Sequence, residues 1–133
     1  MTLIELAERC EAATGPDREI DAAIVIAADT APADMELAFG IGWWRGIYDD
    51  RHWLAPAYTA SLNDAITLLP ERWKLRQMAF SAPCADDRRW HLNLHGGREG
   101  EDTFVGRGAT PALALTAAAL RARAASGEGG VDG

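Results

Sequence analysis

The spacing of apolar residues changes along this 133-residue chain, and this change constrains the fold more than any other feature. In residues 2–28, 61–69 and 110–125 apolar side chains recur every three or four positions, which predicts amphipathic helices. Between residues 72 and 107 they alternate with polar side chains, which predicts half-buried strands. Helical segments before and after one run of strands indicate an α+β domain, with helices packed on a small antiparallel sheet.

Capping residues define the first two helices. Thr2 is expected to cap a helix over residues 2–13, and Glu5, three positions later, completes a capping box. Asp17 is the expected N-cap of the next helix, over residues 17–28. Because the connection between them is short and contains Gly and Pro, the two helices are predicted to form a helical hairpin.

Two further helices are marked by similar signals. Ser61 is the expected N-cap of a helix over residues 61–69, which the following proline ends. The last helix is predicted over residues 110–125, because Thr110 followed by Pro111 is typical of a helix start. After it, the Gly-rich residues 126–133 are expected to form a flexible tail.

The strand candidates form a three-strand meander over residues 72–80, 90–95 and 103–107. In the second of these, apolar and polar residues alternate strictly from Trp90 to His95, which assigns the polar residues to one face of the strand. In the third, Phe104 is the expected inward anchor. The fold class predicted is therefore α+β, with the meander packed by helices and preceded by a helical hairpin.

Residues 29–57 lack regular periodicity but are rich in aromatic residues, which argues against disorder. We expect a packed loop there, with a short strand around residues 41–48. Two interpretations of the aromatic residues stay open. Trp43, Trp44 and Trp53 can form a secondary core under the loop, or an exposed aromatic surface that binds a partner or a second copy of the chain.

Length and composition limit the classes of protein. Residues 1–125 suit a single domain, and 48% hydrophobic residues is a globular composition. A formal charge of −7 argues against binding to long nucleic acid or anionic membranes, which requires positive surface. The segment of about 18 apolar residues that a membrane span needs is missing from the sequence. Cys10 and Cys84, without a secretion signal, predict a reduced, cytoplasmic protein.

Three blocks together resemble the phage ABA-sandwich domain family, a group of small bacteriophage and prophage proteins. They are residues 3–27, residues 56–75 (PAYTASLNDAITLLPERWKL) and residues 108–125 (GATPALALTAAALRARAA). The resemblance implies a phage origin, a location in the cytoplasm of an infected bacterium and an α/β/α layered fold. It carries no catalytic residue and no cofactor to this chain. Asn63 and Thr116 depart from the Asp and Cys that the family often shows.

Charge is distributed unevenly. Residues 72–98 hold 6 basic and 2 acidic side chains in a chain that is acidic overall. If the apolar faces of the first two strands share one core, their other faces form one cationic surface. Its residues are the candidate ligand-binding set: Arg72, Lys74, Arg76, His91, Asn93 and His95. Such a surface would attract a small anion, such as a nucleotide, or an acidic protein. The alternative is a solvated face that balances the acidic N-terminal hairpin.

Other activities find weaker support. Residues 61–125 follow the element order of a double-stranded-RNA-binding domain but lack cations at the start of the last helix. His91 and His95 on one strand are about 13 Å apart, too far to share a metal ion. The loop from Asp49 to His52 pairs carboxylates with a histidine, but nothing places it in a cleft. Gly106 and Gly108 are expected in turns. We therefore predict no metal, no cofactor and no catalytic residue.

The expected function is non-catalytic binding in an infected bacterial cell. The partner would be a small phosphorylated ligand or a host protein, for example a nucleotide signal of bacterial immunity that the phage protein sequesters. The first alternative is a structural or assembly protein that acts as a homo-oligomer through its tryptophans. The weakest alternative is a small hydrolase-like enzyme that uses the Asp49–His52 loop.

Overall fold

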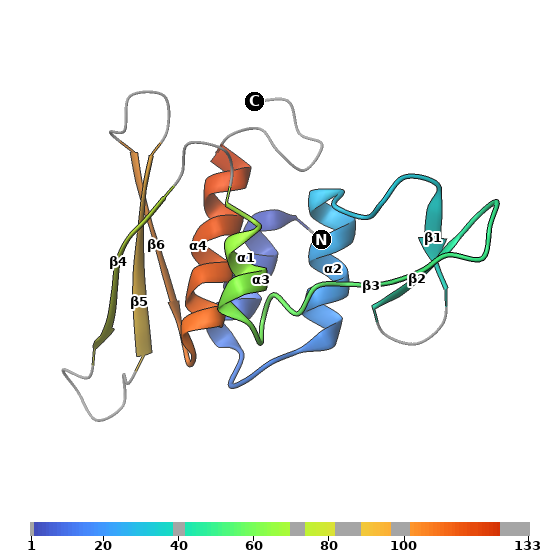
Figure 1. Cartoon of the computed structure of the whole chain (residues 1–133). Coiled ribbons are helices and arrows are strands. Elements are labelled where there is room, and N and C mark those ends of the chain that lie inside the picture. Colours follow the sequence, from blue (N-terminus) through green and yellow to red (C-terminus); the bar gives the residue numbers. More distant parts are fainter. Residues whose placement is uncertain (1, 39–41, 70–73, 82–88, 97–101, 126–133) are drawn as a thin grey trace.

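The computed structural model describes residues 2–38, 42–69, 74–81, 89–96 and 102–125. Within these residues the chain forms, in order, α1 (Leu3–Ala12), α2 (Arg18–Ala28), β1 (Met35–Leu37), β2 (Trp43–Gly46), β3 (His52–Leu54), α3 (Leu62–Ile66), β4 (Lys74–Ser81), β5 (Arg89–Gly96), β6 (Asp102–Gly108) and α4 (Pro111–Ala125) (Figure 1). The α+β class is confirmed, including the N-terminal helical hairpin and the antiparallel meander. The predicted tail, residues 126–133, lies outside the described residues.

Helix α4 is the centre of the fold. Its residues from Ala112 to Leu120 are all buried, so the helix is enclosed on every side rather than amphipathic. The sheet β4-β5-β6, called the large sheet below, packs on one side of α4, and α1 and α3 lie on the other (Figure 1). The described helices all lie on this one side of the large sheet. On its other face, where an α/β/α order would place a second helical layer, we find no described element.

The predicted caps are confirmed. Thr2 accepts a hydrogen bond from the Glu5 backbone N–H at 3.1 Å, and Glu5 Oε1 accepts one from the Thr2 backbone N–H at 3.2 Å. Asp17 caps α2 by accepting from the backbone of residues 19 and 20. Helix α3 ends at Ile66, earlier than predicted, because the backbone hydrogen bonds after this residue span three positions instead of four. Leu68 N–H donates to Ala65, and Leu69 N–H donates to Ile66.

Two glycines in β6 let α4 lie directly on the strand backbone. A Cβ atom on Gly106 would be 2.0 Å from the Ala114 carbonyl oxygen and 2.6 Å from the Ala118 nitrogen. A Cβ atom on Gly108 would be 2.7 Å from the Ala114 nitrogen. Both glycines belong to β6, so the predicted strand over residues 103–107 is confirmed for Gly106, whereas the expectation of turns at Gly106 and Gly108 is wrong. The helix backbone occupies the space above them.

The large sheet is antiparallel throughout, and β5 is its middle strand. The pairing of β5 with β6 is regular from Trp90 opposite Gly108 to Gly96 opposite Asp102. The pairing of β4 with β5 shifts between Leu75 and Gln77, so Arg76 has no partner in the register. The strands match the predicted ones to within about two residues where both are described.

Residues 29–57 form more regular structure than predicted. The expected strand near residues 41–48 is β2, but β1 and β3 flank it and complete an antiparallel sheet, called the small sheet below. Trp44 on β2 and Trp53 on β3 lie opposite each other, with ring centroids 5.6 Å apart in an edge-to-face arrangement. This pair packs against the core, so the expectation of a packed aromatic region holds.

Candidate functional site

The open face of the large sheet, the face away from α4, is the candidate site. Alternation along β5 separates its two faces. Leu92 and Leu94 are fully buried against the core, whereas His91 and Asn93 between them are only partly buried. Because successive residues of a strand point to opposite faces, His91 and Asn93 belong to the open face. The structure therefore brings two of the predicted ligand-binding residues together.

Strand β6 adds two residues to this face that the sequence interpretation missed. Arg107 lies opposite His91 in the register, and Val105 lies opposite Asn93. Both are exposed, while the glycines on either side of Arg107 face α4. The sequence does contain a signal for Arg107. Once Phe104 is assigned to the inner face of the strand, alternation assigns residues 105 and 107 to the outer face.

The remaining predicted ligand-binding residues are placed only in part. Arg72 lies outside the described residues. Lys74 on β4 and His95 on β5 are opposite each other in the register, and Gln77 rather than Arg76 is opposite Asn93. The register shift at Arg76 interrupts the simple alternation that predicted Arg72, Lys74 and Arg76 on one face.

The acidic N-terminal hairpin does not cover the open face. Helix α1 packs on α4 and reaches the edge of the sheet at β6, and α2 lies farther from the sheet (Figure 1). This arrangement answers one question that the charge distribution raised. His91 and Asn93 on β5 therefore do not form an internal layer of ion pairs with the hairpin, whereas Arg107, at the edge of the sheet, contacts α1 through its N–H, which donates to Glu11.

One atom of the open face is unsatisfied. The Nε2 atom of His91 is buried and has no hydrogen-bond partner among the described residues. Leaving a buried polar atom unpaired costs about 1–3 kcal/mol. Such groups are rare enough in folded proteins that each calls for an explanation, and one explanation is a polar group that binds there.

The three predicted partner-binding tryptophans have different environments. Trp44 is 4% exposed and belongs to the hydrophobic core, and Trp53 is partly buried beside it. Trp43 lies on the opposite face of β2 and is 40% exposed. Leu54, directly opposite Trp43 on β3, is 46% exposed. Among the described residues of the three strands, Trp43 and Leu54 are the apolar pair on the outer face of the small sheet.

The Asp49–His52 loop has the geometry of a structured turn. Asp49 Oδ2 accepts from Arg51 Nε at 2.7 Å, and Asp49 Oδ1 accepts from the Arg51 backbone N–H at 3.1 Å. The backbone hydrogen bond, followed by the Arg51 side chain, lowers the pKa of Asp49. An exposed carboxylate held in its ionised form is poorly suited to acid catalysis. In the described part of the chain, no three His, Cys, Asp or Glu side chains gather as metal ligands would.

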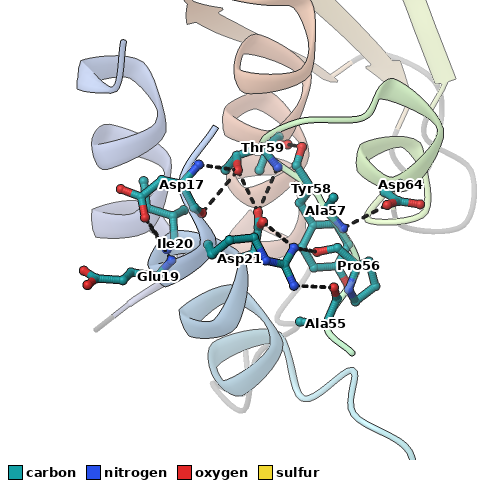
Figure 2. A network of polar contacts seen from close by, with 12 residues as sticks. Asp17, Glu19, Ile20, Asp21, Ala55, Pro56, Ala57, Tyr58, Thr59 and Asp64 are labelled. Atoms are coloured by element: carbon teal, nitrogen blue, oxygen red, sulfur yellow. Dashed lines mark hydrogen bonds and ion pairs between the residues drawn. The ribbon is translucent and has the colours of Figure 1, made fainter. Parts of the chain in front are cut away.

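A buried polar network joins α2 to the segment that precedes α3 (Figure 2). Asp21 is fully buried, and its Oδ1 accepts from the backbone N–H of Thr59 at 2.9 Å and from the Thr59 hydroxyl at 2.8 Å. Its Oδ2 accepts from Arg18 Nη1 at 2.8 Å. Arg18 Nη2 also donates to the Ala55 carbonyl oxygen at 2.8 Å.

This network has a structural role. Burial raises the pKa of Asp21, while hydrogen bonds from Thr59 and the charge of Arg18 oppose that rise. Every described contact of the carboxylate is made within the chain, so its oxygens are already satisfied. The network holds Thr59 and the neighbouring Tyr58, whose carbonyl accepts from Thr116 on α4 at 2.8 Å. It therefore anchors residues 55–59 between α2 and α4.

A shallow hollow lies where three connections meet, next to Thr59. Its lining consists of Pro16, Thr59, Ala60, Leu62, Thr110, Pro111 and Ala112. None of these residues is charged, and the Thr59 hydroxyl is engaged by Asp17 and Asp21. Compared with this hollow, the open face offers the stronger recognition chemistry, since it combines a cation, an imidazole and an amide.

The helices that the structure describes include none with the length and apolar character of a membrane span. Comparison with known proteins adds no assignment: no protein-family model matches the chain, and no curated protein or solved structure matches it. The site is therefore judged on its own residues.

Proposed function

We propose that the chain is a non-catalytic binding protein, and that the open face of the large sheet binds a small anionic ligand such as a nucleotide. The observation that carries the proposal is the group of His91, Asn93 and Arg107 on a face that no described element covers. Arg107 supplies a fixed positive charge, and Asn93 and His91 supply groups that donate hydrogen bonds to phosphate oxygens.

Two further observations support an anion. Strands β4 and β5 contain basic residues and no Asp or Glu, so the local charge is positive although the chain carries −7. Because His91 Nε2 is buried, a ligand reaches it only after the side chains around it move; a hydrogen bond there would then remove the cost of its unpaired state. An acidic surface of a host protein would meet the same charges, and it is the alternative occupant of this face.

The cellular setting is part of the same proposal. The three sequence blocks that resemble the phage ABA-sandwich domain family motivate a phage origin and a place in the cytoplasm of an infected bacterium. A small protein that binds nucleotides there would act by sequestering them, for example as a counter to nucleotide signals in host immunity. Cys10, which is buried and unpaired, is compatible with a reducing compartment.

Calorimetric titration tests the binding proposal. ATP and inorganic pyrophosphate are titrated into the wild-type protein at low salt, and then into Arg107→Glu and His91→Ala. We expect binding that weakens at least about tenfold in Arg107→Glu, because a repulsive charge replaces an attractive one. Arg45→Glu on the small sheet is the control, since Arg45 is exposed and lies far from β5. Binding that is absent in the wild type, or equal in all variants, contradicts the proposal.

A second candidate function is structural, as a homo-oligomer. The observation that favours it is the exposed pair of Trp43 and Leu54, which lie side by side on the outer face of the small sheet. Exposed apolar pairs of this kind occur at the centre of protein interfaces. Sedimentation analysis of Trp43→Ser against the wild type tests it, and a wild-type protein that stays monomeric at millimolar concentration contradicts it.

A further inference from the structure

Strand β6 is an outer strand of the large sheet, and part of its backbone points away from β5. The Arg107 N–H donates to the carboxylate of Glu11 at 3.0 Å. The Val105 carbonyl oxygen accepts a hydrogen bond from Arg121 Nη1 at 3.3 Å. These two backbone groups are therefore satisfied by side chains of α1 and α4 instead of by a neighbouring strand.

Glu11 and Arg121 also bind each other. Arg121 Nη1 donates to Glu11 Oε2 at 2.7 Å, and Arg121 Nη2 donates to Glu11 Oε1 at 2.6 Å, which makes the pair bidentate. Both side chains are 23% exposed. The pair thus presents to β6 one acceptor, the Glu11 carboxylate, and one donor, the Arg121 guanidinium, at fixed positions. A neighbouring β-strand would offer the same two kinds of group.

We infer that Glu11 and Arg121 occupy the strand-pairing edge of β6, and that this edge pairs with β6 of a second copy of the chain once their side chains are removed. An outer strand with free backbone groups is a template for pairing with another chain. Strand β6 is seven residues long and contains no proline, so it is long enough to pair. A second copy is the fitting occupant, because an antiparallel pair of identical strands satisfies two-fold symmetry.

The opposite edge of the sheet is protected in a different way. The ladder between β4 and β5 is interrupted between Leu75 and Gln77, and β4 contains Lys74 and Arg76. A register irregularity and charged residues both discourage strand addition. The ion pair at β6 thus completes the protection of the large sheet at its second edge. Arg107 belongs to both features, because its backbone N–H lies at this edge while its side chain belongs to the open face.

Sedimentation velocity over a concentration series tests the inference in the full-length chain. Glu11→Ala is compared with Glu36→Ala, which removes the same charge and breaks the exposed Glu36–Arg45 ion pair on the small sheet. We expect the mass of Glu11→Ala to rise with concentration towards a dimer, beyond the wild type. Glu36→Ala should follow the wild type. Equal behaviour of the two variants overturns the inference.

Amide hydrogen exchange separates edge pairing from general loss of stability. In dilute Glu11→Ala the Arg107 amide should exchange about tenfold faster than in the wild type, because it loses a charge-assisted bond. Its protection should return at high concentration as the copies pair. Arg107 exchange that is unchanged in the dilute variant contradicts the inference. Arg121→Gln, which exposes the Val105 carbonyl, gives a milder variant should Glu11→Ala fail to fold.

Proline supplies the final control. The Val105 carbonyl points away from β5, and the N–H of the same residue points to the same side, as in any antiparallel strand. Val105→Pro therefore leaves the ladder to β5 intact but blocks the edge. The double variant Glu11→Ala with Val105→Pro should return to the wild-type mass. A double variant that associates as strongly as Glu11→Ala shows that another surface is responsible, and it overturns the assignment to β6.

Discussion

Replacing Gly106 with Ala tests the central packing contact of the fold. The new Cβ atom would lie 2.0 Å from the Ala114 carbonyl oxygen, 2.6 Å from the Ala118 nitrogen and 2.8 Å from the Ala118 Cβ. Ordinary contact begins at 3.4 Å, so strand and helix must separate by about 1.4 Å. Two of the three atoms belong to the helix backbone, which cannot rotate away as a side chain can.

The free energy of unfolding should fall by about 2–3 kcal/mol. Over-packing a well-packed core costs about 1–3 kcal/mol, and the upper end applies because α4 is enclosed on all sides. The lower entropy of the unfolded alanine variant offsets about 0.4–1 kcal/mol of that cost. For a domain of this size, the net loss corresponds to a decrease in Tm of about 6–15 °C.

Urea unfolding followed by circular dichroism, together with scanning calorimetry, measures this loss. Gly15→Ala is the matched control, because no atom lies within 4 Å of a Cβ built there. Ala118→Gly in the Gly106→Ala background should not restore stability, since the backbone contact with Ala114 remains. A Gly106→Ala variant within about 0.5 kcal/mol of Gly15→Ala would refute the claim that α4 lies on the strand backbone.

Three other predictions follow from buried or paired groups. Asp21→Ala should lower the free energy of unfolding by about 2–4 kcal/mol in urea titrations, because it leaves the Thr59 N–H without its acceptor and Arg18 without its ion-pair partner. Burial raises the pKa of Cys10 to about 12, so iodoacetamide at about pH 8 should alkylate this thiol in the unfolded chain but not in the folded one. Arg121 and the Arg107 N–H outweigh burial and lower the pKa of Glu11. The stability that ionised Glu11 gives the folded chain is therefore fully present above the ordinary Glu pKa of about 4.3. It is lost as the pH falls through the lower pKa that Glu11 has in the folded state. Glu11→Gln should flatten the acid side of the plot of unfolding free energy against pH. An unchanged plot would contradict the stabilising role of ionised Glu11.

The helices were predictable because their signals are local. A capping box needs only Thr2 and Glu5, and Asp17 reaches the backbone of residues two and three positions later. The burial of α4 on every side was not predictable in this way. Its apolar residues suggested one stripe, but the helix lies between the large sheet and two other helices, and that position depends on contacts far apart in the sequence.

Strands were predictable where alternation persists. The eight residues of β5 alternate clearly, but β1 and β3 have three residues each, too few to show a period of two. The register shift at Arg76 is also invisible locally, because it is a property of the pair of strands. For the candidate site, His91 and Asn93 followed from alternation, whereas Arg107 required the pairing of β6 with β5.

Residues 3–27, 56–75 and 108–125 contribute central packing contacts of the fold. Residues 108–125 hold Gly108 and the small residues of α4 that allow helix and strand backbones to meet. Residues 3–27 and 56–75 supply both halves of the network of Asp21 and Thr59. The open-face residues His91, Asn93 and Arg107 fall outside all three blocks. Residues that fix the architecture and residues of the open face are therefore separate sets, and binding at the open face has to be tested on its own side chains.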